Sequence, residues 1–113
     1  MRRRAISLLA RLAVAGAVLI PTAAFGGARS ASSHTVTLRN VRFHPGTLTI
    51  NRGDSVTWSW HGREGEHNVS FRGFHSRTGS SGSYTVRFTR AGTFAYVCTI
   101  HVAEGMSGKI IVH

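Results

Sequence analysis

The sequence predicts an all-β fold for residues 34–113, an antiparallel Greek-key β-sandwich of about seven short strands. Apolar residues alternate with polar ones over much of this region, which places one set of side chains on a core face. Turn signals that contain glycine separate the alternating runs. No stretch beyond residue 33 keeps a helical period for three turns, so helices are not expected to build the core.

The alternating runs define the expected core face of each strand. A further strand is expected from Lys109 to Val112, and the stretch from Arg72 to Ser83, rich in Gly and Ser, is expected to form a long surface loop. The residues assigned to the core face are Val36 and Leu38; Leu48 and Ile50; Val56, Trp58 and Trp60; His67, Val69 and Phe71; Tyr84, Val86 and Phe88; and Phe94, Tyr96 and Cys98.

Residues 1–33 have the pattern of a secretory signal peptide followed by a short spacer. Three arginines at positions 2 to 4 precede an uncharged apolar run from Leu12 to Ile20, and Pro21 and small residues follow. This run covers only about half of a bilayer core at about 1.5 Å per residue, so no permanent transmembrane span is expected. Cleavage within residues 24–33 would release a periplasmic, cell-envelope or extracellular protein.

The chain has 113 residues and a formal net charge of +10, but half of this charge lies in the expected signal peptide. Residues 1–33 contain five arginines and no acid, which leaves 9 basic and 4 acidic residues in the remainder. These charges are spread singly and form neither a run nor a helical stripe. A nucleic-acid partner is therefore not expected.

Cys98 is the single cysteine, which excludes an internal disulfide and every metal centre that needs two thiolates from one chain. It begins the pattern Cys-x2-His-x4-Met, which ends at Met106. His67 shares the inward phase of its own strand, as Cys98 does. A thiolate and two imidazoles with a weak thioether form the type 1 blue-copper ligand set, whereas zinc gains little from a thioether. The predicted ligands of one copper ion, Cu(I) or Cu(II), are His67, Cys98, His101 and Met106.

Four segments of residues 34–113 match a known pattern: Phe43-x-Pro45, Gly53-Asp54-Ser55-Val56-x-Trp58, His67-Asn68-Val69 with Phe71, and the loop from Gly92 to Ile110. Through them the chain resembles the cupredoxin family, in particular the plastocyanins and pseudoazurins, whose copper loop the last segment matches. The resemblance implies a cupredoxin sandwich that uses the same four ligands. It also implies that Asn68, beside the ligands, ties the strand of His67 to the copper loop.

The chain departs from this family in features that concern docking and loop rigidity. Val97 stands directly before Cys98 where the plant proteins have an exposed tyrosine, and Ile100 stands where plastocyanins tend to have proline. The chain is basic, whereas the plant proteins carry an acidic patch. Fewer residues separate His67 from Cys98 than is usual in plastocyanins. The resemblance therefore carries over neither the docking mode of photosynthesis nor a reduction potential.

The leading hypothesis is an exported, monomeric one-electron carrier, which redox protein partners contact transiently near His101, Ile100 and Val102. The alternative is a copper-sequestering or copper-delivery protein of the cell envelope that uses the same ligands. An enzyme is not expected, because copper oxidases and nitrite reductases need further His-rich copper sites and the sequence has no His-x-His motif. A metal-free adhesive sandwich is the structural alternative.

Overall fold

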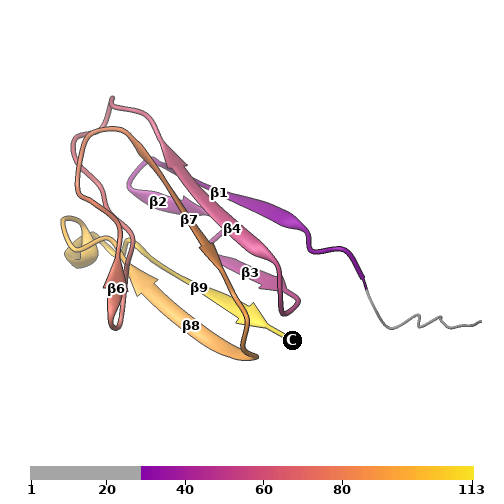
Figure 1. Cartoon of the computed structure of the whole chain (residues 1–113). Helices are drawn as coiled ribbons and strands as arrows, with labels where there is room; N and C mark the ends of the chain where they lie inside the picture. Colours follow the sequence, from indigo (N-terminus) through magenta and orange to yellow (C-terminus); the bar gives the residue numbers. More distant parts are fainter. Residues whose placement is uncertain (1–28) are drawn as a thin grey trace, which may run out of the picture. The chain divides into compact units, whose positions relative to one another are not determined.

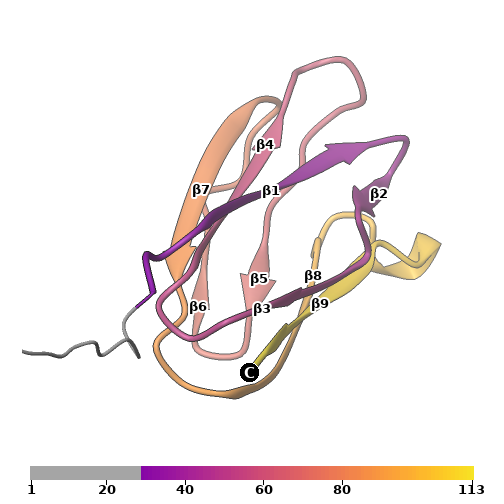
Figure 2. The same cartoon turned by 90° about the vertical axis from the view of Figure 1, so that its right-hand side faces the viewer.

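The computed structural model describes residues 29–113, and within them residues 31–113 form two packed β-sheets (Figures 1 and 2). Residues 1–28 of the expected signal peptide lie outside the described residues. A 3₁₀ helix, η3 (Val102–Glu104), lies between the last two strands. The strands are β1 (Ser33–Arg39), β2 (Arg42–His44), β3 (Thr47–Ile50), β4 (Ser55–Trp60), β5 (Ser70–Phe71), β6 (Phe74–His75), β7 (Gly82–Arg87), β8 (Gly92–Val97) and β9 (Ser107–Val112).

The predicted β-sandwich is confirmed, although strand number and direction differ in part from the expectation. One sheet has the order β2-β1-β4-β7 and the other the order β3-β9-β8-β5-β6. β1 pairs with β4 in parallel, as β3 does with β9, while the other pairs are antiparallel. Alternation along a strand shows which side faces the core but not the direction of its neighbour, so these two parallel pairs could not be predicted.

The expected long loop from Arg72 to Ser83 contains more structure than its composition indicates. It holds β6 and the first residues of β7, and Gly79 forms an isolated bridge with His67. β6 has two residues and β2 has three, which is too short for a period of two to be visible. The alternation of His67, Val69 and Phe71 predicted a longer strand than β5, which has only two residues. Among the described residues, no helix is long and apolar enough to cross a membrane.

The core lies between the two sheets and is built from the residues that alternation assigns to it. Every one of those side chains is buried or half-buried. Trp58 is fully buried at the centre, and its ring meets Tyr96 and Phe71 edge-on with centroid distances of 5.3 and 5.6 Å. Burial raises the pKa of Tyr96 to about 12, so its phenol stays neutral in the core. This aromatic layer supports β8, the strand that leads to Cys98.

Gly108 lies opposite Tyr96 in the pairing of β8 with β9. A Cβ atom at this position would lie 2.6 Å from the Tyr96 hydroxyl and 3.0 Å from the carbonyl oxygen of Gly46. The first contact is shorter than real Cβ atoms make, and the second involves backbone that cannot turn away as a flexible side chain does. The Tyr96 ring and the Gly46 carbonyl therefore leave room only for glycine at position 108.

Replacing Gly108 by alanine is expected to lower the free energy of unfolding by about 1–3 kcal/mol, because the added methyl group overpacks the Tyr96 contact. Gly46→Ala is the matched control, since a Cβ there would meet only the carbonyl oxygen of Phe43, at 3.8 Å. Chemical denaturation of both variants measures the difference. Equal stabilities would show that the close approach has no energetic consequence.

Candidate metal centre

Three side chains with metal-binding atoms meet at one end of the sandwich. His67 lies between β4 and β5, where its backbone N–H donates to Gly79 and its carbonyl accepts from the same residue. Cys98 follows β8 directly, and His101 precedes η3. One ligand atom from each of the three residues lies within 4.8 Å of the others. Segments from distant parts of the sequence thus bring a thiol and two imidazoles together.

The distances between these atoms fit one metal ion. The Cys98 Sγ atom lies 3.9 Å from His67 Nδ1 and 3.8 Å from His101 Nδ1. Nitrogen and sulfur ligands at about 2.0 and 2.3 Å from one ion are about 3.5–3.7 Å apart in tetrahedral or trigonal geometry. The three groups therefore need only a small adjustment to bind a single ion together.

Met106 closes the same loop and is fully buried. The Cys98 N–H donates to the Met106 carbonyl at 3.0 Å, and the Met106 N–H donates to the His101 carbonyl at 3.3 Å. The His101 N–H donates in turn to the Cys98 carbonyl at 3.2 Å. These backbone bonds hold all three predicted ligands of the loop in one short, closed segment. The structure thus brings the four sequence-predicted ligands to one region of the molecule.

His67 is buried in a form that suits metal binding. Burial lowers the pKa of its imidazole, the nearby His101 lowers it further, and the carboxylate of Glu64 opposes both effects. The ring is therefore neutral near pH 7, which is the state that a metal ligand requires. Backbone hydrogen bonding, chiefly from Asn40, holds the pKa of Glu64 below its usual value.

Asn68 connects the segment of His67, which the sequence placed in a strand and the structure places between β4 and β5, to the loop that begins at Cys98. Its Nδ2 group donates to the hydroxyls of Thr99 at 2.7 Å and Thr78 at 2.9 Å. Its Oδ1 atom accepts a hydrogen bond from the Thr99 backbone N–H at 2.9 Å. Asn68 itself is buried. Because Thr99 follows Cys98 directly, these bonds fix the loop relative to His67.

Asn68→Ala is expected to lower the free energy of unfolding by about 1–3 kcal/mol, because the buried Asn68 side chain loses its hydrogen bonds with Thr99 and Thr78. It is also expected to weaken copper binding by about 10–100-fold through the displaced loop. Ser70→Ala is the control, since the Ser70 hydroxyl reaches Asn68 only weakly, at 3.4 Å. Denaturation and copper titration of both variants test this link, and equal losses in the two variants would contradict it.

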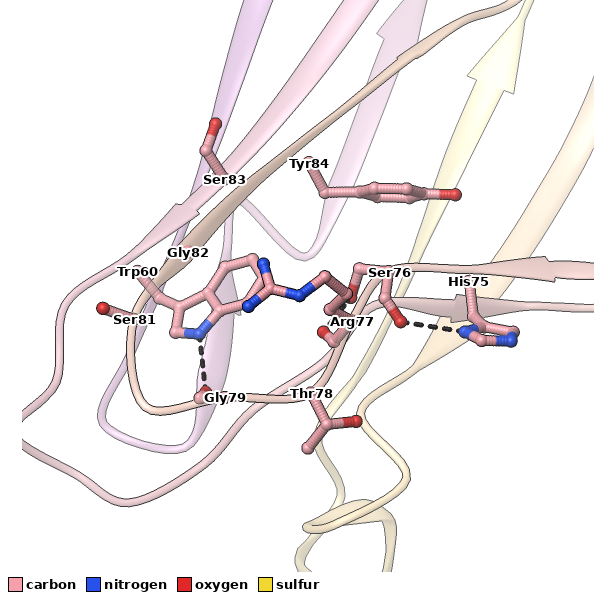
Figure 3. Close-up of a pocket in the computed structure, with 10 residues that line it drawn as sticks. All are labelled: Trp60, His75, Ser76, Arg77, Thr78, Gly79, Ser81, Gly82, Ser83 and Tyr84. Carbon is pink, nitrogen blue, oxygen red and sulfur yellow. Dashed lines mark hydrogen bonds between the residues drawn. The ribbon is translucent and has the colours of Figure 1, made fainter.

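A separate hollow of about 240 Å³ is lined by Trp60 and by residues between His75 and Tyr84 (Figure 3). The Trp60 indole N–H donates to the Gly79 carbonyl at 2.9 Å at one side, and His75 lies at the other. The His75 Nδ1 atom is 2.8 Å from the Ser76 carbonyl, which accepts from it. None of the four predicted ligands lines this hollow. It is therefore not part of the candidate metal centre.

Sequence reasoning missed two kinds of residue around the centre. Thr99 and Thr78 pair with Asn68, and hydroxyl residues in loops give no distinctive signal. Glu64 lies with its Oε1 atom 3.7 Å from the Nε2 atom of His67. The only sequence signal for it was an acidic residue three positions before a predicted ligand, in a loop where charge is common.

Comparison with known proteins decides which metal this arrangement serves. Residues 31–113 match the family described as copper binding proteins of the plastocyanin/azurin family. The chain belongs to this family. Its cofactor is accordingly one copper ion, and the cupredoxin resemblance found in the sequence is confirmed.

Curated and solved members of the family agree with this assignment. The chloroplastic plastocyanin of Tetradesmus obliquus is 34% identical over 127 residues, which cover 96% of this chain and 86% of the relative. The halocyanin of Natronomonas pharaonis is 36% identical over 77 residues, which cover 62% of this chain and 47% of the relative. A solved Cu(I) form of an amicyanin mutant superposes with a TM-score of 0.62 at 30% identity, covering 82% of this chain and 91% of that chain.

Proposed function

We propose that this cupredoxin is an exported, mononuclear type 1 blue copper protein that carries one electron between redox partners. The ligands in this proposal are His67, Cys98, His101 and Met106. The observation that carries it is the buried Cys98 sulfur facing the Nδ1 atoms of two histidines at 3.8 and 3.9 Å. The family match and relatives called plastocyanin, halocyanin and amicyanin support it.

The surroundings of the ligands suit electron transfer. When bound, copper supplies a one-electron couple between Cu(I) and Cu(II) at these ligands. Thiolate and thioether favour Cu(I), while imidazole suits both states. The side chains of His67, Cys98 and Met106 are buried and exclude water, and backbone bonds within the loop fix Cys98, His101 and Met106. A ligand set held in this way changes little between oxidation states, which keeps the reorganisation energy small.

The surface around His101 fits transient docking. His101 is half-buried, whereas Ile100 and Val102 on either side of it are 49% and 50% exposed. Exposed apolar side chains next to a metal ligand give a partner a dry contact close to the metal, and small interfaces of this kind dissociate quickly. The dispersed net charge of +5 favours partners with an acidic surface, and their association weakens as salt concentration rises.

Replacing Ile100 and Val102 together by serine is expected to slow bimolecular electron transfer by about tenfold, because the partner loses about 1.4 kcal/mol of apolar contact. The visible spectrum should stay unchanged, since neither side chain is a proposed ligand. Phe74→Ser is the control, because it removes an exposed apolar side chain from β6. Stopped-flow rates with a redox protein would contradict this docking site if both variants were slowed equally.

The location of the protein belongs to the same proposal. Residues 1–33 have the signal-peptide pattern, with cleavage within residues 24–33, and the product would act in the periplasm, cell envelope or extracellular medium. An electron carrier there needs no catalytic group of its own. The chain contains four acidic residues in all, and none of its side chains has a catalytic role in this function.

Copper titration of the purified protein tests the proposal. One copper ion per chain should bind and give an intense visible absorption from the Cys98 thiolate. The colour should disappear on reduction and return on oxidation. Binding without colour, or no binding, would show that these residues do not form a type 1 centre.

A further inference from the structure

Glu64 places a carboxylate behind the proposed ligand His67. Its Oε1 atom lies 3.7 Å from the Nε2 atom of His67, an ion-pair distance. Its Oε2 atom accepts a hydrogen bond from the Asn40 backbone N–H at 2.7 Å, and Oε1 accepts a longer one from the Val41 N–H at 3.4 Å. The carboxylate thus joins the turn between β1 and β2 to the loop that carries His67.

The backbone of this turn explains why its N–H groups need an external acceptor. Asn40 and Val41 have positive φ angles of 54° and 57°, a conformation that joins tight hairpins and is unusual for a β-branched residue. The turn and the loop with η3 lie at the same end of the sandwich (Figures 1 and 2). With two backbone donors on it, the carboxylate is held in place although Glu64 is 29% exposed.

The orientation of the His67 ring gives this carboxylate a specific role. Nδ1 faces the Cys98 sulfur, so this nitrogen is the one available to a metal ion. The proton of the neutral imidazole must then reside on Nε2, which faces Glu64. At 3.7 Å the contact is within ion-pair distance but longer than a hydrogen bond. A carboxylate on this side of a metal-bound histidine favours the tautomer with the proton on Nε2, restrains the orientation of the ring and raises its basicity.

We propose that Glu64 is a positioning residue of the copper centre, which orients His67 and lowers the reduction potential of the bound copper. This inference rests on the proposed function. The negative charge lies on the Nε2 side of the His67 ring, across the imidazole from Nδ1, the atom that would bind copper. The site becomes more positive by one charge when Cu(I) is oxidised, so the carboxylate stabilises Cu(II) relative to Cu(I).

Glu64→Gln tests the proposal because it removes the charge while keeping a side-chain oxygen for the Asn40 N–H. The equilibrium should shift toward Cu(I) by about three- to tenfold, a rise in potential of about 30–60 mV at 59 mV per tenfold for one electron. Glu66→Gln is the matched control, because it removes the same charge from an exposed position in the same loop. The control should shift the equilibrium by less than about twofold.

The exchange of the His67 Nε2 proton in the Cu(I) protein gives a second readout, measured by NMR of the imidazole. The wild-type proton should be protected, and Glu64→Gln should exchange at least about tenfold faster, which is a loss of about 1.4 kcal/mol of protection. Glu64→Asp keeps the charge on a shorter side chain. Its reduction potential should lie between those of the wild type and Glu64→Gln, and its Nε2 proton should regain a smaller share of the wild-type protection.

The outcomes separate this proposal from the proposed function. A wild-type protein that binds copper without the intense colour contradicts the proposed function. A blue protein in which Glu64→Gln and Glu66→Gln have the same potential overturns only the role of Glu64. An unprotected Nε2 proton in the wild-type Cu(I) protein overturns that role as well, even if Glu64→Gln fails to fold.

Discussion

Replacing Cys98 by serine is expected to abolish the intense visible absorption of the copper-loaded protein and to weaken copper binding at least about 100-fold. The absorption depends on a thiolate bound to Cu(II), and a serine hydroxyl neither ionises near pH 7 nor matches the softness of sulfur. Cys98 is completely buried, and its sulfur is the atom that both histidine Nδ1 atoms face. Serine differs from cysteine in a single atom, so the surrounding sandwich should remain folded.

His75→Ala provides the comparison for this variant. His75 lies on β6, and its Nδ1 atom bonds to the Ser76 carbonyl rather than joining the cluster around Cys98. Absorption spectra of both variants with one equivalent of Cu(II), together with circular dichroism to check folding, complete the experiment. A blue Cys98→Ser protein would mean that another residue supplies the colour.

Copper loading is expected to stabilise the fold by about 4 kcal/mol when free copper is 1,000-fold above the dissociation constant, because the ion binds the folded state. The ligands come from the segment around His67 and from the loop after β8, which have to be in place together to bind one ion. Unfolding therefore separates the ligands, and most of the free energy of copper binding is lost.

Denaturant unfolding with and without copper measures this stabilisation. In Cys98→Ser the difference should fall to about 1.4 kcal/mol or less, because an affinity at least about 100-fold weaker leaves copper at most about tenfold above the dissociation constant. Zinc is a useful second ion, since it can occupy the thiolate and imidazole ligands without redox chemistry. Equal free energies of unfolding for the metal-free and copper-loaded wild-type protein would contradict a copper site that exists only in the folded chain.

The alternation of apolar and polar residues made most of the fold predictable. The candidate ligands were predictable because the chain has one cysteine and a single methionine beyond the first residue. His67 and Cys98 share the inward phase of buried neighbours, and both are buried in the structure. The close spacing of Cys98, His101 and Met106 required only a tight loop, which the backbone bonds between them provide. Local patterns were sufficient here because three ligands lie within one short segment after β8, and the isolated bridge of His67 to Gly79 keeps it in the phase of Val69 and Phe71.

Long-range pairing and the surroundings of the ligands could not be read in the same way. The direction of β1 relative to β4 depends on how the chain crosses between sheets, and β6 is too short to show a period. Glu64 approaches His67 because the turn at Asn40, 24 positions earlier, folds back to it. Such a contact depends on backbone geometry that appears only after the sheets have formed.

Electron self-exchange tests the central claim most directly, because it separates a carrier from a protein that only stores or delivers copper. NMR line broadening in mixtures of the Cu(I) and Cu(II) forms measures the rate at which two molecules exchange an electron. A type 1 carrier with its ligands fixed in both states should exchange rapidly and reversibly, with one electron per bound copper. Slow exchange, or loss of copper on reduction, would contradict the electron-carrier function and favour copper storage or delivery.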